Sequence, residues 1–376
     1  MKLKFRSLDF PVYIFFTILA FCKGIDLTKD SKIYIILYVV GIMLLTIRLF
    51  KQKYNLKQIF LIFIMMIISI LVLLIGHNST PLFFTIAVCS LKDTNLNKIL
   101  KLIFYVHFVS FVTMIFLSSI GIIENHYILH MRNNIGLTKR YFFGYLHPNL
   151  VQTHLLSLII LYYYLYGKKS NYIISIFWFL FSFILFKFTY SRTSFVLSIM
   201  FIILFMITRN KPKLKKFIAF FGKYSFVILF VFTIFLSITY KSSNFTKKID
   251  DILTGRIYYL NYVYTNYNVP IIGYSNYGEK IAIDNSYFSL LYQSGVAFTL
   301  IIFLLNLYIA KKKYDEKDYD FLIIMLFINL LCFTENLYLV PTINFLSLIM
   351  MSNIIKRLDK GECQNESNNI KVFQKI

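Results

Sequence analysis

Residues 58–76 read QIFLIFIMMIISILVLLIG, a run that contains no charged side chain. A bilayer core about 30 Å thick is crossed by a helix of about 20 apolar residues, so this run predicts a transmembrane helix. Eleven further apolar runs come near the same length along the chain. We therefore predict twelve spans, at approximately residues 8–25, 33–50, 58–76, 79–91, 99–122, 146–166, 171–188, 193–208, 224–240, 287–310, 319–334 and 337–355.

The composition of the whole chain supports the same class. Of its 376 residues, 58% are hydrophobic and 15% are charged, and it contains 41 Phe and 29 Tyr. Soluble domains have about 45–50% apolar residues even with glycine included. The apolar runs follow one another too closely to leave room for a separate globular unit. We expect an all-α polytopic membrane protein, with one membrane domain over residues 1–355 and a short cytoplasmic tail over 356–376.

The formal net charge of +23 has a topological explanation. In a soluble protein it would suggest a nucleic-acid partner, but in membrane proteins Lys and Arg mark the segments that stay in the cytoplasm. With the N-terminus inside, about two-thirds of the 40 Lys and Arg fall on the cytoplasmic side. We expect both termini in the cytoplasm and no nucleic-acid partner. The short run 79–91 leaves open a re-entrant helix there.

This topology predicts two substantial external loops, at about residues 123–145 and 241–286, the second between spans nine and ten. The longer loop is rich in tyrosine. Its residues 254–267 have helical spacing that places Tyr258 and Tyr262 on one face, and Pro270 ends this segment.

Several kinds of chemistry are not indicated by the sequence. It contains no GxxxxGK[ST] phosphate loop, so ATP-driven work is not expected. Its four cysteines show no CxxC spacing, and no other set of residues has the spacing of a metal site. We therefore expect neither a metal nor a cofactor.

Three arginines lie in or beside the predicted external loops. Arg192 occurs in TYSRTS, Arg256 in TGRIYYLNY, and Arg140 in the shorter loop. Such arginines face polar cavities in many membrane proteins, although an interfacial anchor or a solvated loop charge is the alternative for each. Together they suit a phosphate or pyrophosphate anion, which Arg binds through two parallel hydrogen bonds.

Other polar residues flank the same loops. His147 and Asn149 occur in GYLHPNLVQ, where they indicate either the rim of a cavity or an interfacial helix start. Asp284 and Asn285, in IDNSYFSLLYQSG, precede span ten. Asp284 could act as a general base or as a helix N-cap. Glu335, near the outer end of span eleven, could pair with an arginine or remain an interfacial charge.

Four of these motifs, in this order relative to the spans, resemble the O-antigen and capsule polymerases, the Wzy-type membrane glycosyltransferases, which are distantly similar to O-antigen ligases. The motifs are GYLHPN, YSRTS, the loop from GRIYYLNY through PIIGYSNYGEK, and DNSYFSLLYQSG. The resemblance covers roughly residues 144–304.

The resemblance implies an inverting, metal-independent glycosyltransferase in the bacterial cytoplasmic membrane. Such an enzyme would join polyprenyl-pyrophosphate-linked oligosaccharides at the outer face, beside a flippase and a chain-length regulator. It implies that Arg192 and Arg256 bind the donor pyrophosphate. Ligase relatives carry a histidine before the Asn in the position of Asp284, which leaves Asp284 as the candidate base. The expected substrate contacts are Arg140, His147, Asn149, Asn285, Tyr258, Tyr262 and Glu335.

Two other functions remain open at this stage. A flippase or other secondary transporter can also have about twelve spans, but transporters show repeated halves and polar groups at the midplane. Here the halves are dissimilar, and polar residues gather in the external loops. An O-antigen ligase would differ from a polymerase only in its acceptor.

Overall fold

The computed structural model describes residues 9–27, 31–132, 136–274, 277 and 283–358. Most of these residues are helical, which confirms the predicted class of membrane protein built from helices. Seven helical segments are long and apolar enough to cross a bilayer. They are α2 (Lys32–Lys51), α3 (Leu56–Gly76), α5 (Leu96–Ser119), α7 (Tyr172–Thr189), α8 (Arg192–Arg209), α9 (Pro212–Thr239) and the continuous segment Ser286–Asp315.

The remaining helices are shorter or less apolar. Three apolar ones have 10–17 residues: α1 (Phe10–Gly24), α4 (Thr80–Cys89) and α14 (Tyr319–Thr334). The segment Ser286–Asp315 consists of α12 (Ser286–Ser289), a π-helical turn η3 (Leu290–Ser294) and α13 (Gly295–Asp315). The other helices are α6 (Pro148–Tyr166), the short η2 (Gly167–Lys169), α10 (Asn244–Ile252), α11 (Arg256–Asn266) and residues 346–358.

The predicted boundaries need three corrections. The last predicted span, 337–355, is helical only from residue 346, because the preceding residues form turns. The ninth helix begins at Pro212, well before the predicted 224, since its backbone hydrogen bonds continue through a basic segment. A hairpin of β1 (Tyr127–Arg132) and β2 (Gly136–Tyr141) occupies the shorter loop, where no strand was predicted. Most of the predicted tail, residues 359–376, lies outside the described residues.

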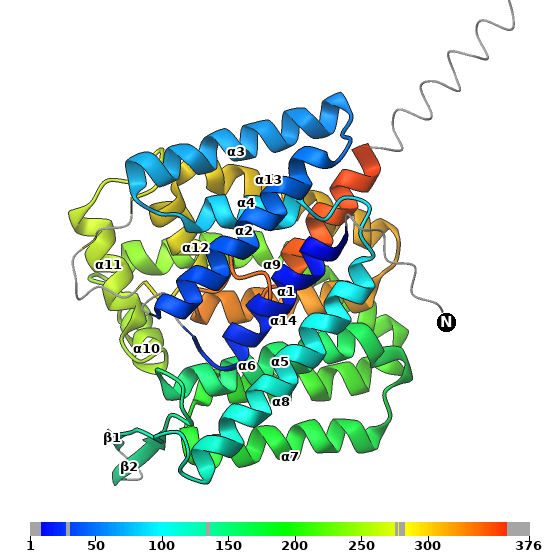
Figure 1. The fold of residues 1–376 in the computed structure, drawn as a ribbon. Coiled ribbons are helices and arrows are strands. Elements are labelled where there is room, and N and C mark those ends of the chain that lie inside the picture. Colours follow the sequence, from blue (N-terminus) through cyan, green and yellow to red (C-terminus); the bar gives the residue numbers. More distant parts are fainter. Residues whose placement is uncertain (1–8, 28–30, 133–135, 275–276, 278–282, 359–376) are drawn as a thin grey trace, which may run out of the picture.

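The helices form layers around α6. Residues 151–161 of α6 are all buried, whereas the outer helices α2, α3 and α7 keep many large apolar side chains exposed. A continuous apolar exterior of this kind requires lipid around it. The β1–β2 hairpin, α10 and α11 lie together at one end of the bundle, on the left in Figure 1. We call this the loop end.

Several polar side chains of α6 form hydrogen bonds with neighbouring helices. Gln152 donates to the Ser182 hydroxyl (2.6 Å), and Thr153 shares a hydrogen bond with Ser194 (2.9 Å). The rings of His154 and His107 are joined by a hydrogen bond of 2.8 Å. Because these groups pair inside the bundle, α6 can carry them without exposing them to lipid.

A buried arginine network joins the helices at the opposite end. Arg48 is 2% exposed, and its guanidinium donates to Asp9 (2.9 Å) and Gln52 (2.6 Å). It also donates to the carbonyls of Ser90 (2.8 Å) and Lys92 (3.1 Å), which follow the C-terminus of α4. The sequence placed Arg48 among charges that only orient helices, but here it holds α1, α2 and α4 together.

Three glycines dock the long loop onto the bundle. A Cβ on Gly273 would lie 2.1 Å from the carbonyl oxygen of Gln293, and one on Gly76 would lie 2.0 Å from the carbonyl oxygen of Gly273. Gly295 has a φ of +85°, which favours glycine. The carbonyls of Pro270 and Ile271 accept hydrogen bonds from backbone N–H groups just after η3, and the N–H of Tyr274 donates to a carbonyl within η3. The regular α-helical hydrogen bonds are interrupted at this π-helical turn. Residues 270–274 of the long loop are therefore packed against the domain.

The Arg48 network predicts a large stability difference between two neighbouring residues. Replacing Arg48 by Met leaves the Asp9 carboxylate and two carbonyls without their donor, so we expect a loss of about 3–5 kcal/mol in the free energy of unfolding. Lys51→Met changes an exposed charge at the same helix end and should alter it by less than about 0.5 kcal/mol. Unfolding of the purified variants in detergent measures both, and equal effects would contradict the structural role of Arg48.

Candidate functional site

Two carboxylates hold one arginine at the loop end. Arg256 Nη2 donates to Glu335 Oε1 at 2.9 Å, and Arg256 Nε lies 3.4 Å from Asp284 Oδ2. The three residues come from α11, the segment before α12 and the C-terminus of α14. The structure thus brings together three of the predicted site residues, which are far apart in the sequence. We call them the Arg256 cluster.

Local capping places Arg256 at the first residue of α11. The chain reverses at Gly255, whose φ is +83°. The buried Asp250 carboxylate then accepts hydrogen bonds from the backbone N–H groups of Ile257 (2.7 Å) and Tyr258 (3.4 Å). Because Asp250 satisfies these first donors of the helix, the Arg256 side chain is free to reach the two acidic residues.

Burial sets the electrostatics of the cluster. It raises the pKa of Glu335 and of Asp284 above their ordinary values, and the positive charge of Arg256 opposes the rise in both. Glu335 is nearly buried, whereas the Asp284 side chain is 43% exposed. Asp284 is therefore the carboxylate that can meet a substrate, and its raised pKa makes it a stronger base than a free aspartate.

A second group of predicted residues joins the hairpin to the ends of α6 and α7. Arg140, on β2, donates from Nε to the Thr189 carbonyl (2.9 Å) and from Nη2 to Asn149 Oδ1 (2.6 Å). His147 is the N-cap of α6 and accepts from the Asn149 N–H through Nδ1 (3.2 Å). We call Arg140, His147 and Asn149 the hairpin group.

The charges of both the hairpin group and the Arg256 cluster act on His147. Its pKa is lowered to about 4, first by burial and then by the positive charges of Arg140 and Arg256. The imidazole is therefore neutral near pH 7 and can accept or donate a hydrogen bond there.

Arg192 is the first residue of α8. It follows the turn after Thr189, whose carbonyl accepts a hydrogen bond from Arg140. The Arg192 side chain is exposed and makes no hydrogen bond or ion pair with the residues that the structure describes. Of the predicted catalytic residues, Arg192 is thus the cation whose charge is not already paired.

The other predicted residues have different surroundings. Asn285 is 4% exposed; it caps α12 at Phe288 N (3.0 Å) and donates to Thr233 and the Phe333 carbonyl. These contacts give it a structural role, and its contact with substrate stays a prediction. Tyr258 and Tyr262 lie on the exposed face of α11, with exposed fractions of 50% and 41%.

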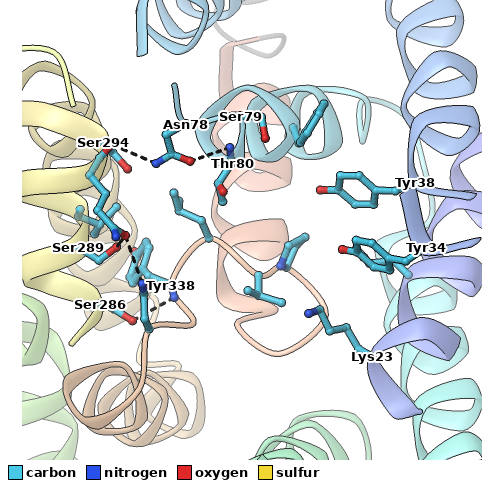
Figure 2. Close-up of a pocket in the computed structure, with 18 of the residues that line it drawn as sticks. Lys23, Tyr34, Tyr38, Asn78, Ser79, Thr80, Ser286, Ser289, Ser294 and Tyr338 are labelled. Atoms are coloured by element: carbon cyan, nitrogen blue, oxygen red, sulfur yellow. Dashed lines mark hydrogen bonds between the residues drawn. The ribbon is translucent and has the colours of Figure 1, made fainter. Parts of the chain in front are cut away.

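A cavity of about 630 Å³, lined by both polar and apolar side chains, lies between α1, α2, the start of α4, η3 and residues 336–341. Figure 2 shows polar side chains turned toward this space from several of these elements. The ones it labels are Lys23, Tyr34, Tyr38, Asn78, Ser79, Thr80, Ser286, Ser289, Ser294 and Tyr338. This cavity was not predicted from the sequence, in which the polar run Asn78–Thr80 is its one visible signal.

Ser286 links the cavity to the Arg256 cluster. Its hydroxyl donates to the Glu335 carbonyl (2.5 Å) and accepts from the N–H groups of Leu337 (2.8 Å) and Tyr338 (3.1 Å). Ser286 and Asn336 both line the cavity. Ser286 lies two residues after Asp284, and Asn336 directly follows Glu335.

Among the described residues, no three His, Cys, Asp or Glu side chains gather as metal ligands. Comparison with protein-family models, curated proteins and solved structures gave no match to this chain. The residues and their geometry are therefore the evidence from which a function can be proposed.

The Arg256 cluster predicts a pH-dependent stability defect. Arg256→Met removes the charge that opposes burial, so the pKa values of Asp284 and Glu335 should rise further. A carboxyl group with a raised folded-state pKa stabilises the protein below its unfolded value, about 4, and this contribution is lost as pH rises through the folded-state pKa. We expect the unfolding temperature of Arg256→Met to fall from pH 5 to pH 8 more steeply than that of the wild type.

Arg192→Met provides the matched control, because it removes an arginine that has no carboxylate partner among the described residues. Its unfolding temperature should follow the wild-type pH dependence. If the two variants behave alike between pH 5 and pH 8, the ion pairs of Arg256 do not determine the stability of this region.

Proposed function

We propose that this chain is a membrane glycosyltransferase that polymerises polyprenyl-pyrophosphate-linked oligosaccharide repeat units into a surface polysaccharide. The observation that carries the proposal is the half-exposed Asp284 carboxylate, which is held by Arg256 and lies two residues before Ser286 in the wall of a cavity. A base fixed next to a space lined by hydroxyl and amide groups suits the attack of one sugar hydroxyl on another sugar.

In the proposed reaction Asp284 accepts the proton of the attacking acceptor hydroxyl. The hydroxyl oxygen forms a new bond to the anomeric carbon of the donor sugar. The bond from that carbon to the phosphate oxygen breaks, and polyprenyl pyrophosphate leaves with the electron pair. Cleavage of this activated bond drives the reaction without ATP, and a single displacement inverts the anomeric configuration.

The geometry supports a different division of roles among the arginines from the one the resemblance implies. Arg256 already faces two carboxylates, so its charge is largely offset. We assign it to holding Asp284 in place. The exposed Arg192 and the neighbouring hairpin group, with Arg140, are then the cations that would stabilise the charge growing on the pyrophosphate.

We propose twelve membrane passes with both termini in the cytoplasm and the loop end outside, in the bacterial cytoplasmic membrane. Two observations support this orientation. The β1–β2 hairpin and the α10–α11 segment, which the charge distribution assigns to one side, do lie at one end of the bundle (Figure 1). The lysine-rich segments that begin α9 and end α13 are the ones assigned to the cytoplasm. A flippase and a chain-length regulator would be its partners.

Substitutions at the site test the function in a bacterium that depends on this chain for its polysaccharide. Asp284→Asn and Arg192→Ala should each reduce long surface polysaccharide by at least about a hundredfold, the scale of losing one general base or one electrostatic contact. Single repeat units should still reach the surface. Asp251→Asn, an exposed carboxylate on α10, is the matched control and should leave the chain-length ladder unchanged.

Gel separation of surface and lipid-linked glycans distinguishes the competing functions. Loss of a flippase would trap lipid-linked single units on the cytoplasmic side. Loss of a ligase would leave full-length polymer attached to its lipid carrier. Either pattern, or a normal ladder in Asp284→Asn and Arg192→Ala, would overturn the polymerase proposal.

A further inference from the structure

Three interruptions of the helical backbone meet at the cavity between α1, α2 and the start of α4. One is the turn at residues 77–79 between α3 and α4, where His77 has a φ of +51°. The second is the π-helical turn η3, and the third is the non-helical segment 335–345 that follows α14. Residues of all three line the cavity of about 630 Å³.

Such interruptions are costly in a protein that is surrounded by lipid. Non-helical backbone is stable there only where it is buried in protein or lines a water-filled cavity. Residues 341–345 are all buried, and the side chain of Asn344 donates to the Tyr338 carbonyl at 2.9 Å, which satisfies a group that has no helical partner. π-Helical turns also occur frequently at functional sites. The meeting of three interruptions at one cavity, of a volume within the roughly 300–1,000 Å³ usual for small-molecule sites, indicates a binding site.

Several polar groups in the lining make no hydrogen bond with the residues that the structure describes. They are the hydroxyls of Tyr34, Tyr38, Ser79 and Ser294 and the Nε2 amide of Gln293. Figure 2 shows the hydroxyls of Tyr34 and Tyr38 pointing into the space from α2. A ligand with several hydroxyl groups can satisfy such donors and acceptors together, and a sugar ring is a ligand of this kind.

The Gln293 carboxamide is held so that its N–H groups are left for a ligand. Its Oε1 accepts hydrogen bonds from Ser289 Oγ (2.5 Å) and Asn336 Nδ2 (3.4 Å), and its backbone carbonyl accepts from Asn78 Nδ2 (3.0 Å). Because the side-chain oxygen is engaged by two donors, the orientation of the carboxamide is fixed before any ligand enters. A donor that is already ordered loses little entropy on binding.

We propose that this cavity binds one sugar residue of the lipid-linked oligosaccharide, and that Gln293 determines which sugar is accepted by donating from Nε2 to an oxygen of that sugar. The inference rests on the proposed function, because it names the part of the polymerase substrate that the cavity holds. Tyr34 and Tyr38 bind further hydroxyl groups of the same sugar. A site of this kind rejects an analogue that lacks the matching oxygen, since the donor is then left unpaired.

Direct binding to the full-length protein in detergent tests the inference without relying on polymerisation. The probe is the repeat-unit oligosaccharide, released by partial hydrolysis from the surface polysaccharide of the bacterium that carries this chain. Maltotriose serves as the unrelated sugar. Calorimetric titration should show that the wild type binds the repeat unit at least about tenfold more tightly than maltotriose, a difference equivalent to about 1.4 kcal/mol.

Gln293→Glu isolates the proposed donor. It keeps an oxygen for Ser289 and Asn336 and replaces Nε2 by a second oxygen. We expect it to bind the repeat unit at least about tenfold more weakly than the wild type, because the sugar oxygen then faces an acceptor instead of a donor. Its unfolding temperature should stay close to that of the wild type.

A pair of tyrosine variants tests the other wall of the cavity. Tyr34→Phe removes one hydroxyl but keeps the ring that stacks on Tyr38, at 5.4 Å between ring centres. It should weaken binding of the repeat unit about threefold to tenfold, the effect of losing one hydrogen bond. Tyr172→Phe, at an exposed position that begins α7, is the matched control and should bind like the wild type.

The inference is overturned if the wild type does not prefer the repeat unit to maltotriose, or if folded Gln293→Glu binds the repeat unit as tightly as the wild type. Should Gln293→Glu not fold, Tyr34→Phe decides in the same way. The glycan gel is an independent measurement. Binding that depends on Gln293, together with the gel pattern of a flippase or a ligase, would keep the binding site and reject the polymerase. A polymerase pattern with binding that does not depend on Gln293 would reject the binding site alone.

Discussion

Every polar group inside this helical bundle has to find a partner within the protein, because lipid offers none. Arg48 meets this requirement because its guanidinium donates hydrogen bonds to two side chains and two backbone carbonyls at one end of the bundle. Residues 270–274 meet it at the π-helical turn, where they pair with backbone groups that a regular helix would satisfy itself. The long loop is thereby fixed to the bundle, and its chemistry is held at a defined position.

The Arg256 cluster depends on that docking. Asp284 precedes α12, Glu335 follows α14, and Arg256 begins α11, so their meeting requires the loop to be folded against the helix ends. Burial raises the pKa of both carboxyl groups, and the positive charge of Arg256 opposes that rise. In the proposed function this arrangement assigns proton transfer to the exposed carboxylate and anion binding to Arg140 and Arg192.

The sequence predicted part of this site. Arg256 was a candidate as the start of the helical part of the long loop, and Asp284 and Glu335 were candidates at helix boundaries. For Glu335 the sequence left open both an arginine partner and an interfacial charge. The cavity was not foreseen, because Lys23, Tyr34 and Asn78 lie in three separate helical regions with no shared motif. The hairpin was missed for a similar reason, since a short loop rich in polar residues has no strong alternation to mark strands.

The sequence by itself determined that the chain is a helical membrane protein, because apolar runs of about 20 residues have few other stable environments. Its charge pattern also predicted which segments share a side of the membrane. Only the tertiary structure decided that Arg48 is a buried cross-link while Lys51 is exposed, and that Arg256 pairs with two carboxylates while Arg192 has no partner among the described residues. Residue type and spacing set what a side chain can do, but its partners come from segments far away in the chain.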